Sequence, residues 1–336
     1  MKSYELNEIG IENLNVVESE MPQPKANEVL VKIHAVSLNY RDLMVVKGQY
    51  NPRLKFPVIP FSDGAGEVVE VGENVTKWKV GDRVCPIFSQ GWIEGAPSAQ
   101  KSKTALGGGG DWDGILREFG TFNEEGLVKI PANLSFEEAA TLPCAAVTAW
   151  DALVVSGNLK AGEIVLTQGT GGVSIFALQF AKLFGAKVIS TSSSDKKLVK
   201  VKELGANETI NYKETPDWDK ATLGLTNKIG VDHIVEVGGS GTMAKSVNAI
   251  KIGGHIAVIG VLSSGNDFNP VSLLMKQVRM HGIFVGSRQM FEDMNRAIEL
   301  NKLKPVIDKV FEFSHAQEAL KYMESGAHFG KIVVKI

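Results

Sequence analysis

The chain has 336 residues, of which 44% are hydrophobic and 22% charged, and its formal net charge is −2. This balance is typical of a globular protein large enough for two domains, and it offers no basic surface for nucleic acid. The polar N-terminus is unlike a signal peptide, and no apolar run approaches the roughly eighteen residues of a membrane span. With only two cysteines, Cys85 and Cys144, the chain is no disulfide scaffold, so a cytoplasmic location is expected.

The first part of the chain is predicted to be rich in β-structure. Residues 27–35 alternate between apolar and polar side chains, and residues 64–72 form a second candidate strand. Short strands joined by turns predict a small barrel-like domain. Residues 88–119 differ, because Gly, Ser, Ala and Lys predominate and apolar anchors are few, so we expect a long surface loop there.

The middle of the chain is predicted to alternate between strands and helices. A capping box precedes this region, since Glu138 follows Ser135 by three positions at a predicted helix start. Six strands are predicted, at 163–168, 187–192, 209–212, 232–237, 255–261 and 280–285. Helices are predicted at 195–204, 243–250 and 291–303, and a final strand at 331–336. Strands joined by helical crossovers predict an α/β fold with a doubly wound parallel sheet.

A glycine-rich turn stands between the first two of the six strands. It reads Gln168-Gly169-Thr170-Gly171-Gly172 and opens a predicted helix. Such a turn presents backbone N–H groups and a helix N-terminus to a pyrophosphate. Ser174 replaces the third glycine of the dinucleotide-binding fingerprint, and an ordinary βα turn without a ligand is the alternative.

Five motifs together carry a resemblance to a known family. They are Asn39-Tyr40-Arg41-Asp42, Pro60-Phe61-Ser62-Asp63-Gly64-Ala65-Gly66, Val80-Gly81-Asp82-Arg83-Val84, Gly169-Thr170-Gly171-Gly172-Val173 and Leu204-Gly205-Ala206. In their order and spacing the chain resembles a medium-chain dehydrogenase/reductase over nearly its whole length. The resemblance implies a GroES-like β-barrel domain from both chain ends, residues 1–125 and 286–336. It also implies an inserted Rossmann domain, residues 126–285, with a doubly wound six-stranded parallel sheet.

The resemblance does not extend to the zinc sites of the family. Zinc-bearing alcohol dehydrogenases of this family hold a catalytic zinc with two Cys and one His, and the aligned positions here are Asn39, Ser62 and Cys144. One thiolate cannot supply the three protein ligands of a catalytic zinc. Residues 88–119 contain no cysteine, so the family's structural zinc lobe is also missing. We therefore expect no metal, a small buried side chain at Cys144, and a closer likeness to zinc-independent quinone oxidoreductases and enoyl reductases.

The resemblance also implies the form of the cofactor. NAD-preferring sites place an acidic side chain at the end of the second strand, where this chain has Ser192 and Ser193. Lys197 and Tyr212 match a Lys–Tyr pair that lies against the 2′-phosphate in NADPH-dependent relatives, so NADP(H) is expected. The alternatives are that both are ordinary helix and strand residues and that Asp195 supplies the acid. Further cofactor-binding residues implied by position are Thr148, Gly169, Thr170, Gly171, Gly172, Val173, Gly238, Gly260, Val261, Gly286, Ser287 and Lys331.

Without a metal, neutral donors must stabilise the negative charge that hydride transfer builds on a carbonyl oxygen. Tyr50 aligns with a tyrosine that enoyl reductases of the family place over the substrate, while Asn39 and Tyr40 lie on the segment that borders the cleft. These three are the candidate catalytic residues, with plain packing of an aromatic ring on a loop as the alternative for Tyr50. Asp63 is expected to form a structural ion pair with Arg41 or with another base.

The chain is thus expected to be an NADPH-dependent oxidoreductase that transfers hydride to a quinone or an α,β-unsaturated carbonyl compound. The alternatives are a zinc-free alcohol or aldehyde dehydrogenase and a non-catalytic NADPH-binding structural or sensor protein. A hydrolase is not expected, because no G-x-S-x-G elbow occurs. Family members commonly pair through edge strands, so we expect a homodimer through the apolar runs 255–259 and 282–285, with no nucleic-acid or membrane partner.

Overall fold

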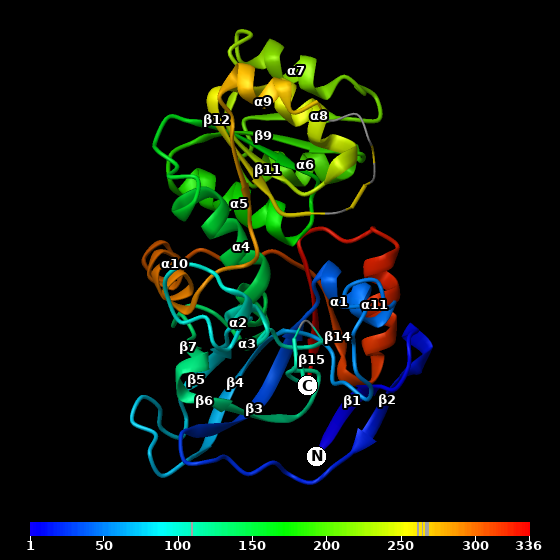
Figure 1. Cartoon of the computed structure of the whole chain (residues 1–336), viewed down its shortest axis with the longest axis vertical. Coiled ribbons are helices and arrows are strands. Elements are labelled where there is room, and N and C mark those ends of the chain that lie inside the picture. The colour runs from blue at the N-terminus through cyan, green and yellow to red at the C-terminus, as the bar shows by residue number, and fades with distance from the viewer. Residues whose placement is uncertain (109, 261, 264, 266–268) are drawn as a thin grey trace. The chain divides into compact units, whose positions relative to one another are not determined.

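The computed structural model describes residues 1–108, 110–260, 262–263, 265 and 269–336. The chain forms two compact units, one from Met1–Val147 with Val285–Ile336 and the other from Thr148–Phe284 (Figure 1). Residues 126–147, which the sequence assigns to the second domain, lie in the first unit. Within the described ranges, no helix combines the length and the apolar character that crossing a membrane requires.

The first unit is built on a seven-stranded sheet. Its strands run in the order β14 (Ile307–Glu312), β15 (Lys331–Lys335), β3 (Glu28–Ser37), β4 (Asp63–Val71), β5 (Arg83–Pro86) and β7 (Leu127–Lys129), and β6 (Phe119–Asn123) pairs with β3. Only β14 and β15 run parallel to each other. Because β15 pairs with β3, the sheet joins segments from the two ends of the chain, as expected (Figure 1).

Further elements surround this sheet. They are β1 (Lys2–Leu6), β2 (Leu14–Glu18), α1 (Tyr40–Val46), α2 (Ala99–Ser102), α3 (Phe136–Ala140), α10 (Arg288–Asn301), α11 (Ala316–Glu324), the 3₁₀ turns Ile11–Asn13, Glu124–Gly126 and Phe313–His315, and the π turn Leu142–Ala146. The predicted capping box opens α3, because the Glu138 N–H donates to Ser135 Oγ at 3.2 Å and the Ser135 N–H donates to Glu138 Oε2 at 2.8 Å. The apolar core of the unit includes Phe61, Phe122 and Leu320.

Residues 88–119 form the predicted surface loop only in part, since residues 94–100 are exposed while both ends of the segment pack into the unit. Among the large apolar side chains of this segment, Phe88, Trp92, Leu106, Ile115 and Leu116 are less than 5% exposed. A Cβ added to Gly107 or Gly114 would lie within 2.4 Å of the Phe61 carbonyl oxygen. The glycines therefore allow close packing against the core instead of marking an exposed loop. The expectation failed for the two buried ends because single apolar anchors among small residues leave no periodic pattern.

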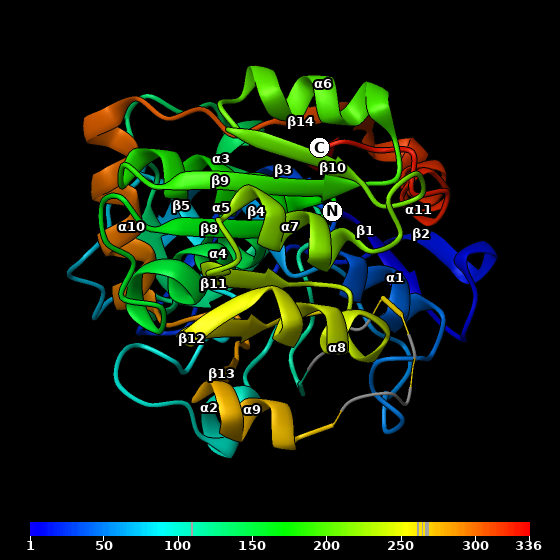
Figure 2. The same cartoon turned by 90° about the horizontal axis from the view of Figure 1, so that it is seen from above.

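The second unit is a six-stranded parallel sheet with helices on both faces. The strand order is β10 (Glu208–Asn211), β9 (Lys187–Ser192), β8 (Ile164–Gln168), β11 (Val231–Glu236), β12 (Ile250–Val258) and β13 (Arg279–Gly282) (Figure 2). The helices are α4 (Val147–Trp150), continued by the π turn Asp151–Val155, α5 (Gly172–Leu183), α6 (Asp195–Glu203), α7 (Trp218–Leu225), α8 (Ser240–Ala249) and α9 (Val271–Lys276). The doubly wound parallel sheet is confirmed.

Three histidines lie side by side on the sheet of the second unit. His233, His255 and His281 come from β11, β12 and β13, and their ring centroids are 5.8 and 6.1 Å apart. His255 is 1% exposed, and neither of its ring nitrogens has a hydrogen-bond partner in the part of the chain that the structure describes. Burial, reinforced by His233 and Arg279, lowers the pKa of His255 to about 4.

We expect the protein to lose stability between pH 7 and pH 5 through His255. The unfolded chain binds a proton there near pH 6.5, whereas the folded protein binds it only near pH 4. The unfolded state therefore gains protons first as the pH falls, which lowers the free energy of unfolding by about 2 kcal/mol over this range. Urea unfolding of the wild type and His255→Phe at the two pH values measures the effect.

The control for this prediction is His315→Phe, because His315 is exposed. In this variant the free energy of unfolding should change with pH as it does in the wild type. In His255→Phe the decrease in the free energy of unfolding between pH 7 and pH 5 should be smaller by about 2 kcal/mol. An unchanged pH dependence in His255→Phe would contradict the prediction.

Candidate functional site

The glycine-rich turn of the second unit joins β8 to α5, as predicted. Gly169 has a φ of +71°, which L side chains rarely adopt. Gly171 is the N-cap of α5, and no side chain of a described residue caps this helix. A Cβ added to Gly169 or Gly171 would meet no atom within 4 Å, so the turn faces open space. Uncapped N–H groups beside open space suit an anionic pyrophosphate.

Ser174 stands where the dinucleotide-binding fingerprint has its third glycine. Its hydroxyl donates to the Gln168 carbonyl at 2.6 Å, and the side chain is 3% exposed. This bond ties the first turn of α5 to the end of β8. The serine thus permits the close packing of helix and strand for which the fingerprint uses glycine. Thr170, Gly172 and Val173 belong to the same turn and the start of the helix.

A second turn, residues 237–239, follows β11 at the same edge of the sheet. The Gly238 carbonyl accepts hydrogen bonds from the N–H and the hydroxyl of Ser263, at 2.7 and 2.8 Å. Gly260 packs so closely on this turn that an added Cβ would lie 1.8 Å from the Val237 carbonyl oxygen. Only glycine fits there. The neighbouring predicted residue, Val261, lies outside the described residues.

The end of β9 carries the residues predicted to distinguish NADP(H) from NAD(H). The carbonyl of Ser192, which is 3% exposed, accepts a hydrogen bond from the Tyr212 N–H at 3.0 Å. Lys197 lies in the first turn of α6, and its N–H donates to the N-cap hydroxyl of Ser194 at 3.5 Å. The structure therefore brings Ser192, Ser193, Lys197 and Tyr212 to one corner of the second unit.

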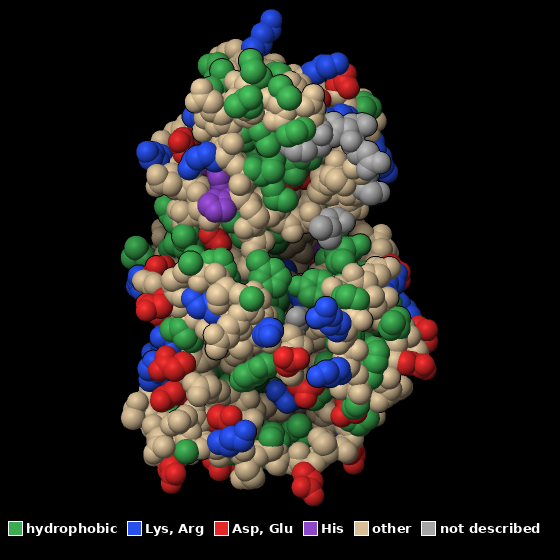
Figure 3. Space-filling view, viewed as in Figure 1, with side chains coloured by type: hydrophobic (Ala, Val, Ile, Leu, Met, Phe, Trp, Pro, Cys, Tyr) green, Lys and Arg blue, Asp and Glu red, His purple; other side chains and the backbone are tan. Residues whose placement is uncertain are grey.

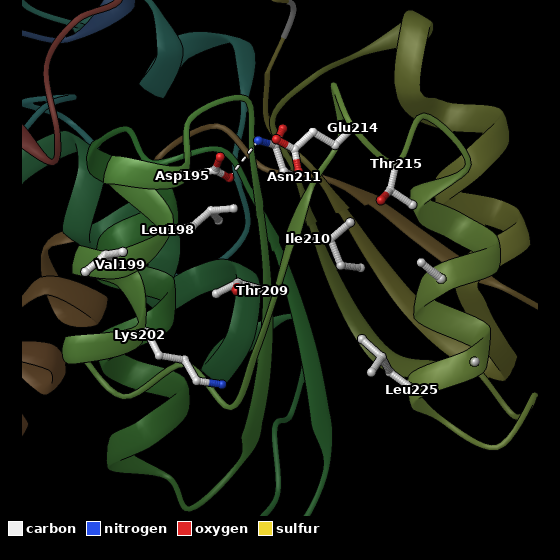
Figure 4. Close-up of a pocket in the computed structure, with 12 residues that line it drawn as sticks. Asp195, Leu198, Val199, Lys202, Thr209, Ile210, Asn211, Glu214, Thr215 and Leu225 are labelled. Carbon is white, nitrogen blue, oxygen red and sulfur yellow. Dashed lines mark hydrogen bonds between the residues drawn. The ribbon is translucent and has the colours of Figure 1, made fainter.

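Asp195, the acidic alternative at this corner, is engaged elsewhere. Its Oδ1 accepts a hydrogen bond from Asn211 Nδ2 at 2.8 Å (Figure 4). The two residues line a groove of about 790 Å³ between α6, β10 and α7, with Leu198, Ile210 and Leu225 among its apolar walls. None of the predicted cofactor residues lines this groove, so we assign it no part in cofactor binding.

A buried polar cluster lies in the first unit around Asn39 and Asp63. Lys331 Nζ, on β15, donates to the Leu38 carbonyl and to Asn39 Oδ1, both at 2.6 Å. Asp63 accepts hydrogen bonds from Ser62 Oγ at 2.8 Å and from the Cys144 N–H at 2.9 Å. Burial raises the pKa of Asp63 and lowers the pKa of Lys331, and the attraction between the two groups opposes both shifts.

The Asn39 Nδ2 donor makes no hydrogen bond of normal geometry in this cluster, although it lies close enough to the Asp63 carboxylate to help lower the pKa of that acid. The residue is 8% exposed, and its Nδ2 is buried without a hydrogen-bond partner among the residues that the structure describes. Because the Lys331 ammonium can only donate, it fixes the amide with Oδ1 toward itself and leaves Nδ2 for another acceptor. An unpaired buried donor of this kind is costly unless a ligand uses it.

Arg41 pairs with Asp42, so the expected pairing of Asp63 with Arg41 is wrong, and the base whose charge acts on Asp63 is Lys331. Arg41 Nη1 lies 2.9 Å from Asp42 Oδ1, and Nη2 donates to the Gly107 carbonyl at 3.0 Å. Burial raises the pKa of Asp42 to about 6 against the opposing effect of Arg41. The guanidinium also lies 4.8 Å from the centre of the Tyr50 ring, and burial raises the pKa of the Tyr50 hydroxyl.

The residues at the aligned zinc positions do not fit a zinc ion. Cys144 is partly exposed and not fully buried as expected, yet the burial that it has raises the pKa of its thiol and disfavours the thiolate that binds metal. The Ser62 hydroxyl is bonded to Asp63, and the Asn39 oxygen already faces the Lys331 ammonium, which would repel a cation. Across the described ranges, no group of three or more His, Cys, Asp or Glu side chains is arranged to hold a metal.

The remaining predicted residues lie in both units. Thr148, in the second unit, is 3% exposed. Gly286 and Ser287 lie in the first unit, where the Ser287 hydroxyl caps α10 by accepting the Met290 N–H at 3.3 Å. Tyr40 begins α1 with 46% of its side chain exposed, outside the buried cluster.

Two polar residues that the sequence analysis did not select stand beside the turns of the second unit. Gln168 ends β8 and Glu236 ends β11, and they are 5% and 0% exposed. Their side chains share a hydrogen bond of 2.7 Å. The available signal was an acidic residue inside the otherwise apolar run Ile234-Val235-Glu236-Val237.

Two family models match the chain. Residues 25–132 match the alcohol dehydrogenase GroES-like domain, and residues 172–300 match the zinc-binding dehydrogenase domain. A zinc-type alcohol dehydrogenase-like protein of Schizosaccharomyces pombe is 47% identical, covering 97% of this chain and 96% of that protein. A chloroplast envelope quinone oxidoreductase homolog of Arabidopsis thaliana is 33% identical, covering 97% and 95%.

Solved structures with the same fold differ in their cofactor. A putative alcohol dehydrogenase of Sinorhizobium meliloti has a TM-score of 0.93 and 38% identity, covering 100% of this chain and 98% of that one. An NAD-dependent alcohol dehydrogenase has a TM-score of 0.91 and 34% identity, covering 100% of both chains. The 2-octenoyl-CoA carboxylase reductase CinF, in complex with NADP and 2-octenoyl-CoA, has a TM-score of 0.85 and 25% identity, covering 99% and 87%.

Proposed function

Since the chain belongs to the medium-chain dehydrogenase/reductase superfamily, we propose that it is a zinc-independent reductase that uses NADPH to reduce a quinone or an α,β-unsaturated carbonyl compound. Family membership itself makes the protein an oxidoreductase whose fold, a GroES-like domain with a Rossmann-type sheet, binds a nicotinamide cofactor. The proposal concerns the metal, the form of the nicotinamide and the acceptor.

The observation that carries the proposal is the cluster around Asn39. Zinc-bearing members of the family use the metal to stabilise negative charge on the substrate oxygen, and the three aligned residues here do not fit zinc. A lysine ammonium, an amide and a carboxylate occupy this part of the unit instead, and the Asn39 Nδ2 donor, which lies near Asp63, makes no hydrogen bond of normal geometry to a described residue. A neutral donor beside a buried cation suits an oxygen that becomes negative during the reaction.

When bound, NADPH supplies the hydride, and the residues of this cluster stabilise the negative charge that hydride transfer places on the acceptor oxygen. Asn39 Nδ2 donates to the carbonyl oxygen of the acceptor as electron density moves onto it. Lys331 acts through Asn39, since its ammonium holds Oδ1 and polarises the amide. Asp63 balances the positive charge of Lys331. Water supplies the protons that complete the product.

The preference for NADPH is proposed from the corner at the end of β9. Ser192, Lys197 and Tyr212 come together there, and hydroxyl and ammonium groups suit a 2′-phosphate. The acid that would favour NADH, Asp195, is bonded to Asn211. The NADP complex of CinF supports this choice, while the NAD-dependent alcohol dehydrogenase shows that the fold serves both cofactors.

We expect chelator-treated protein to oxidise NADPH, and NADH far more slowly, with 9,10-phenanthrenequinone and with a 2-enal. A metal-free site predicts that chelation leaves these rates unchanged. Stopped assays with and without added Zn²⁺ measure the difference. Activity that is lost on chelation and restored by zinc would contradict the metal-free proposal. Turnover of primary alcohols with NADP⁺ and none of these acceptors would indicate an alcohol dehydrogenase instead.

We also propose a homodimer that forms through β13. The predicted run 255–259 cannot serve, because it belongs largely to β12, which pairs with β11 and β13, and of the predicted run 282–285 only Gly282 belongs to β13. By contrast, β13 ends the sheet and all four of its residues are exposed. Apolar side chains gather on the face that carries α9 (Figure 3), where Leu274 and Met275 are 75% and 72% exposed.

Sedimentation equilibrium should give twice the chain mass of 36.3 kDa at micromolar concentration. Met280→Lys, on β13, should shift the protein toward monomer, because it places a charge where two apolar surfaces would meet. Ile229→Lys, at another exposed apolar position, serves as the control and should remain dimeric. A monomeric wild type would contradict the proposal.

A further inference from the structure

Glu236 is a buried carboxylate that receives five hydrogen bonds at the carboxyl end of β11. The N–H groups of Gly238 and Gly239 and the hydroxyl of Thr242 donate to Oε1, at 2.9, 3.0 and 2.5 Å. Gln168 Nε2 donates to Oε2 at 2.7 Å, and the Ser246 hydroxyl also donates to this oxygen. Every partner is a donor, which satisfies a side chain that is 0% exposed.

Gln168 connects this carboxylate to the glycine-rich turn. It is the last residue of β8, directly before Gly169, and its Nε2 also donates to Ser246 Oγ at 2.8 Å. Its Oε1 accepts the Gly238 N–H at 3.2 Å, and its backbone carbonyl accepts the Ser174 hydroxyl. Gln168 therefore binds the second turn, 237–239, through its side chain, and through its backbone carbonyl it binds the first turn of α5, which directly follows residues 169–171.

The two turns flank the point where the sheet changes direction. From β8 the chain winds outward through β9 to β10, then crosses to β11 and winds the other way through β12 to β13. Ligands of open α/β sheets bind beyond the carboxyl ends of the strands at this crossover point, here between β8 and β11. The hydrogen bond between the Gln168 and Glu236 side chains connects the ends of the two strands across this point.

The backbone of the second turn depends on this carboxylate. Gly239 is the N-cap of α8 and has a φ of +91°. No side chain of a described residue caps α8 from that position, and Oε1 of Glu236 instead binds the two glycine N–H groups. A negative charge at a helix N-terminus is also favoured by the helix dipole. The turn is held by a residue of the preceding strand.

We propose that Gln168 and Glu236 are positioning residues for the nicotinamide cofactor, which fix the spacing of the two turns between which it binds. This inference rests on the cofactor binding described under the proposed function. Neither side chain needs to touch the cofactor: they act through the backbone of residues 169–172 and 237–239. The two turns then have their binding conformation before the cofactor arrives, which lowers the free-energy cost of ordering them on binding.

Gln168→Met tests the proposal, because methionine keeps the length of the side chain and removes both its donor and its acceptor. We expect the Kd for NADPH, measured by nucleotide fluorescence, to rise about tenfold. Hydrogen exchange of the nucleotide-free protein should accelerate in peptides covering 168–174 and 236–243. Ser246→Ala, which removes a single hydroxyl from the network, should change both quantities in the same direction by less.

Thr167→Val is the matched control on the neighbouring position of β8. The Thr167 hydroxyl is buried and bonded to Ser190 Oγ at 2.7 Å, on the opposite face of the strand from Gln168. Thr167→Val should lower the melting temperature as much as Gln168→Met does. It should nevertheless leave the Kd for NADPH within about twofold of the wild-type value and the hydrogen exchange of both turns unchanged.

Three results are decisive. A raised Kd with faster exchange in both turns, absent from Thr167→Val, supports positioning. A Kd or exchange in Gln168→Met no different from that of Thr167→Val overturns it. If the wild type binds neither NADPH nor NADH, the proposed function itself fails, and the exchange data still show whether the side chains couple the two turns.

Discussion

Asn39→Asp is expected to lower kcat for a 2-enal with saturating NADPH by about a hundredfold or more. Aspartate keeps the shape of asparagine and the contact of one oxygen with Lys331, but it replaces the Nδ2 donor with a second oxygen. Loss of one donor to a developing oxyanion typically costs about 10² to 10³ in kcat. Because the change lies outside the glycine-rich turn, the KM for NADPH should stay within about threefold.

Two comparisons make this result specific. Aspartate is as good an N-cap as asparagine, so the melting temperature should show that α1 is intact. Tyr50→Phe tests the second candidate donor, and it should lower turnover of enones more than that of quinones. An Asn39→Asp enzyme with wild-type kcat would remove Asn39 from the proposed mechanism.

Lys197→Glu is expected to raise the KM for NADPH about a hundredfold and leave the KM for NADH within about threefold. The change removes a cation and adds an anion at the corner proposed to hold the 2′-phosphate, and each charge contributes about 1–2 kcal/mol at a partly exposed site. NADH lacks that phosphate, so the ratio of kcat/KM values for the two cofactors isolates the effect.

The control for this change is Lys196→Glu, the same charge reversal one position earlier on α6. Lys196 is exposed, whereas Lys197 is half-buried beside the N-cap of the helix. The control should change the KM for NADPH by less than about threefold, because an exposed charge is screened by solvent. Equal effects of the two variants would mean that the 2′-phosphate does not bind at this corner.

The sequence predicts the second unit better than the first. Its strands are short apolar runs bounded by glycine or polar residues, and five of the six begin within one residue of the predicted positions. The exception is β12, which begins at Ile250 because α8 ends at Ala249 and the chain turns directly into the strand. The predicted helices α5, α6 and α8 are also present, as is α10 in the first unit, while α7 and α9 were not predicted.

The buried cluster of the first unit was beyond prediction from local pattern. Lys331 reaches Asn39 only because β15 pairs with β3, which brings together residues separated by 292 positions. Asp63 was expected to pair with Arg41 or with another base, yet Arg41 contacts the adjacent Asp42. The family motif identified the segment that carries Asn39. The hydrogen-bond partners of that residue, however, depend on how strands that are distant in the sequence pair.

The place of β15 in the sheet has a consequence for synthesis on the ribosome. The strand lies between β14 and β3, yet all of the second unit is translated before it. At about 5–20 residues per second, residues 1–147 wait about 10–40 s for the strand that completes their sheet. During that interval the end of β3, from Ala35 to Ser37, lacks its partner on the β15 side. A nascent chain with an open strand edge is a natural client for a chaperone, so we expect the yield of folded protein to depend on chaperone supply during translation.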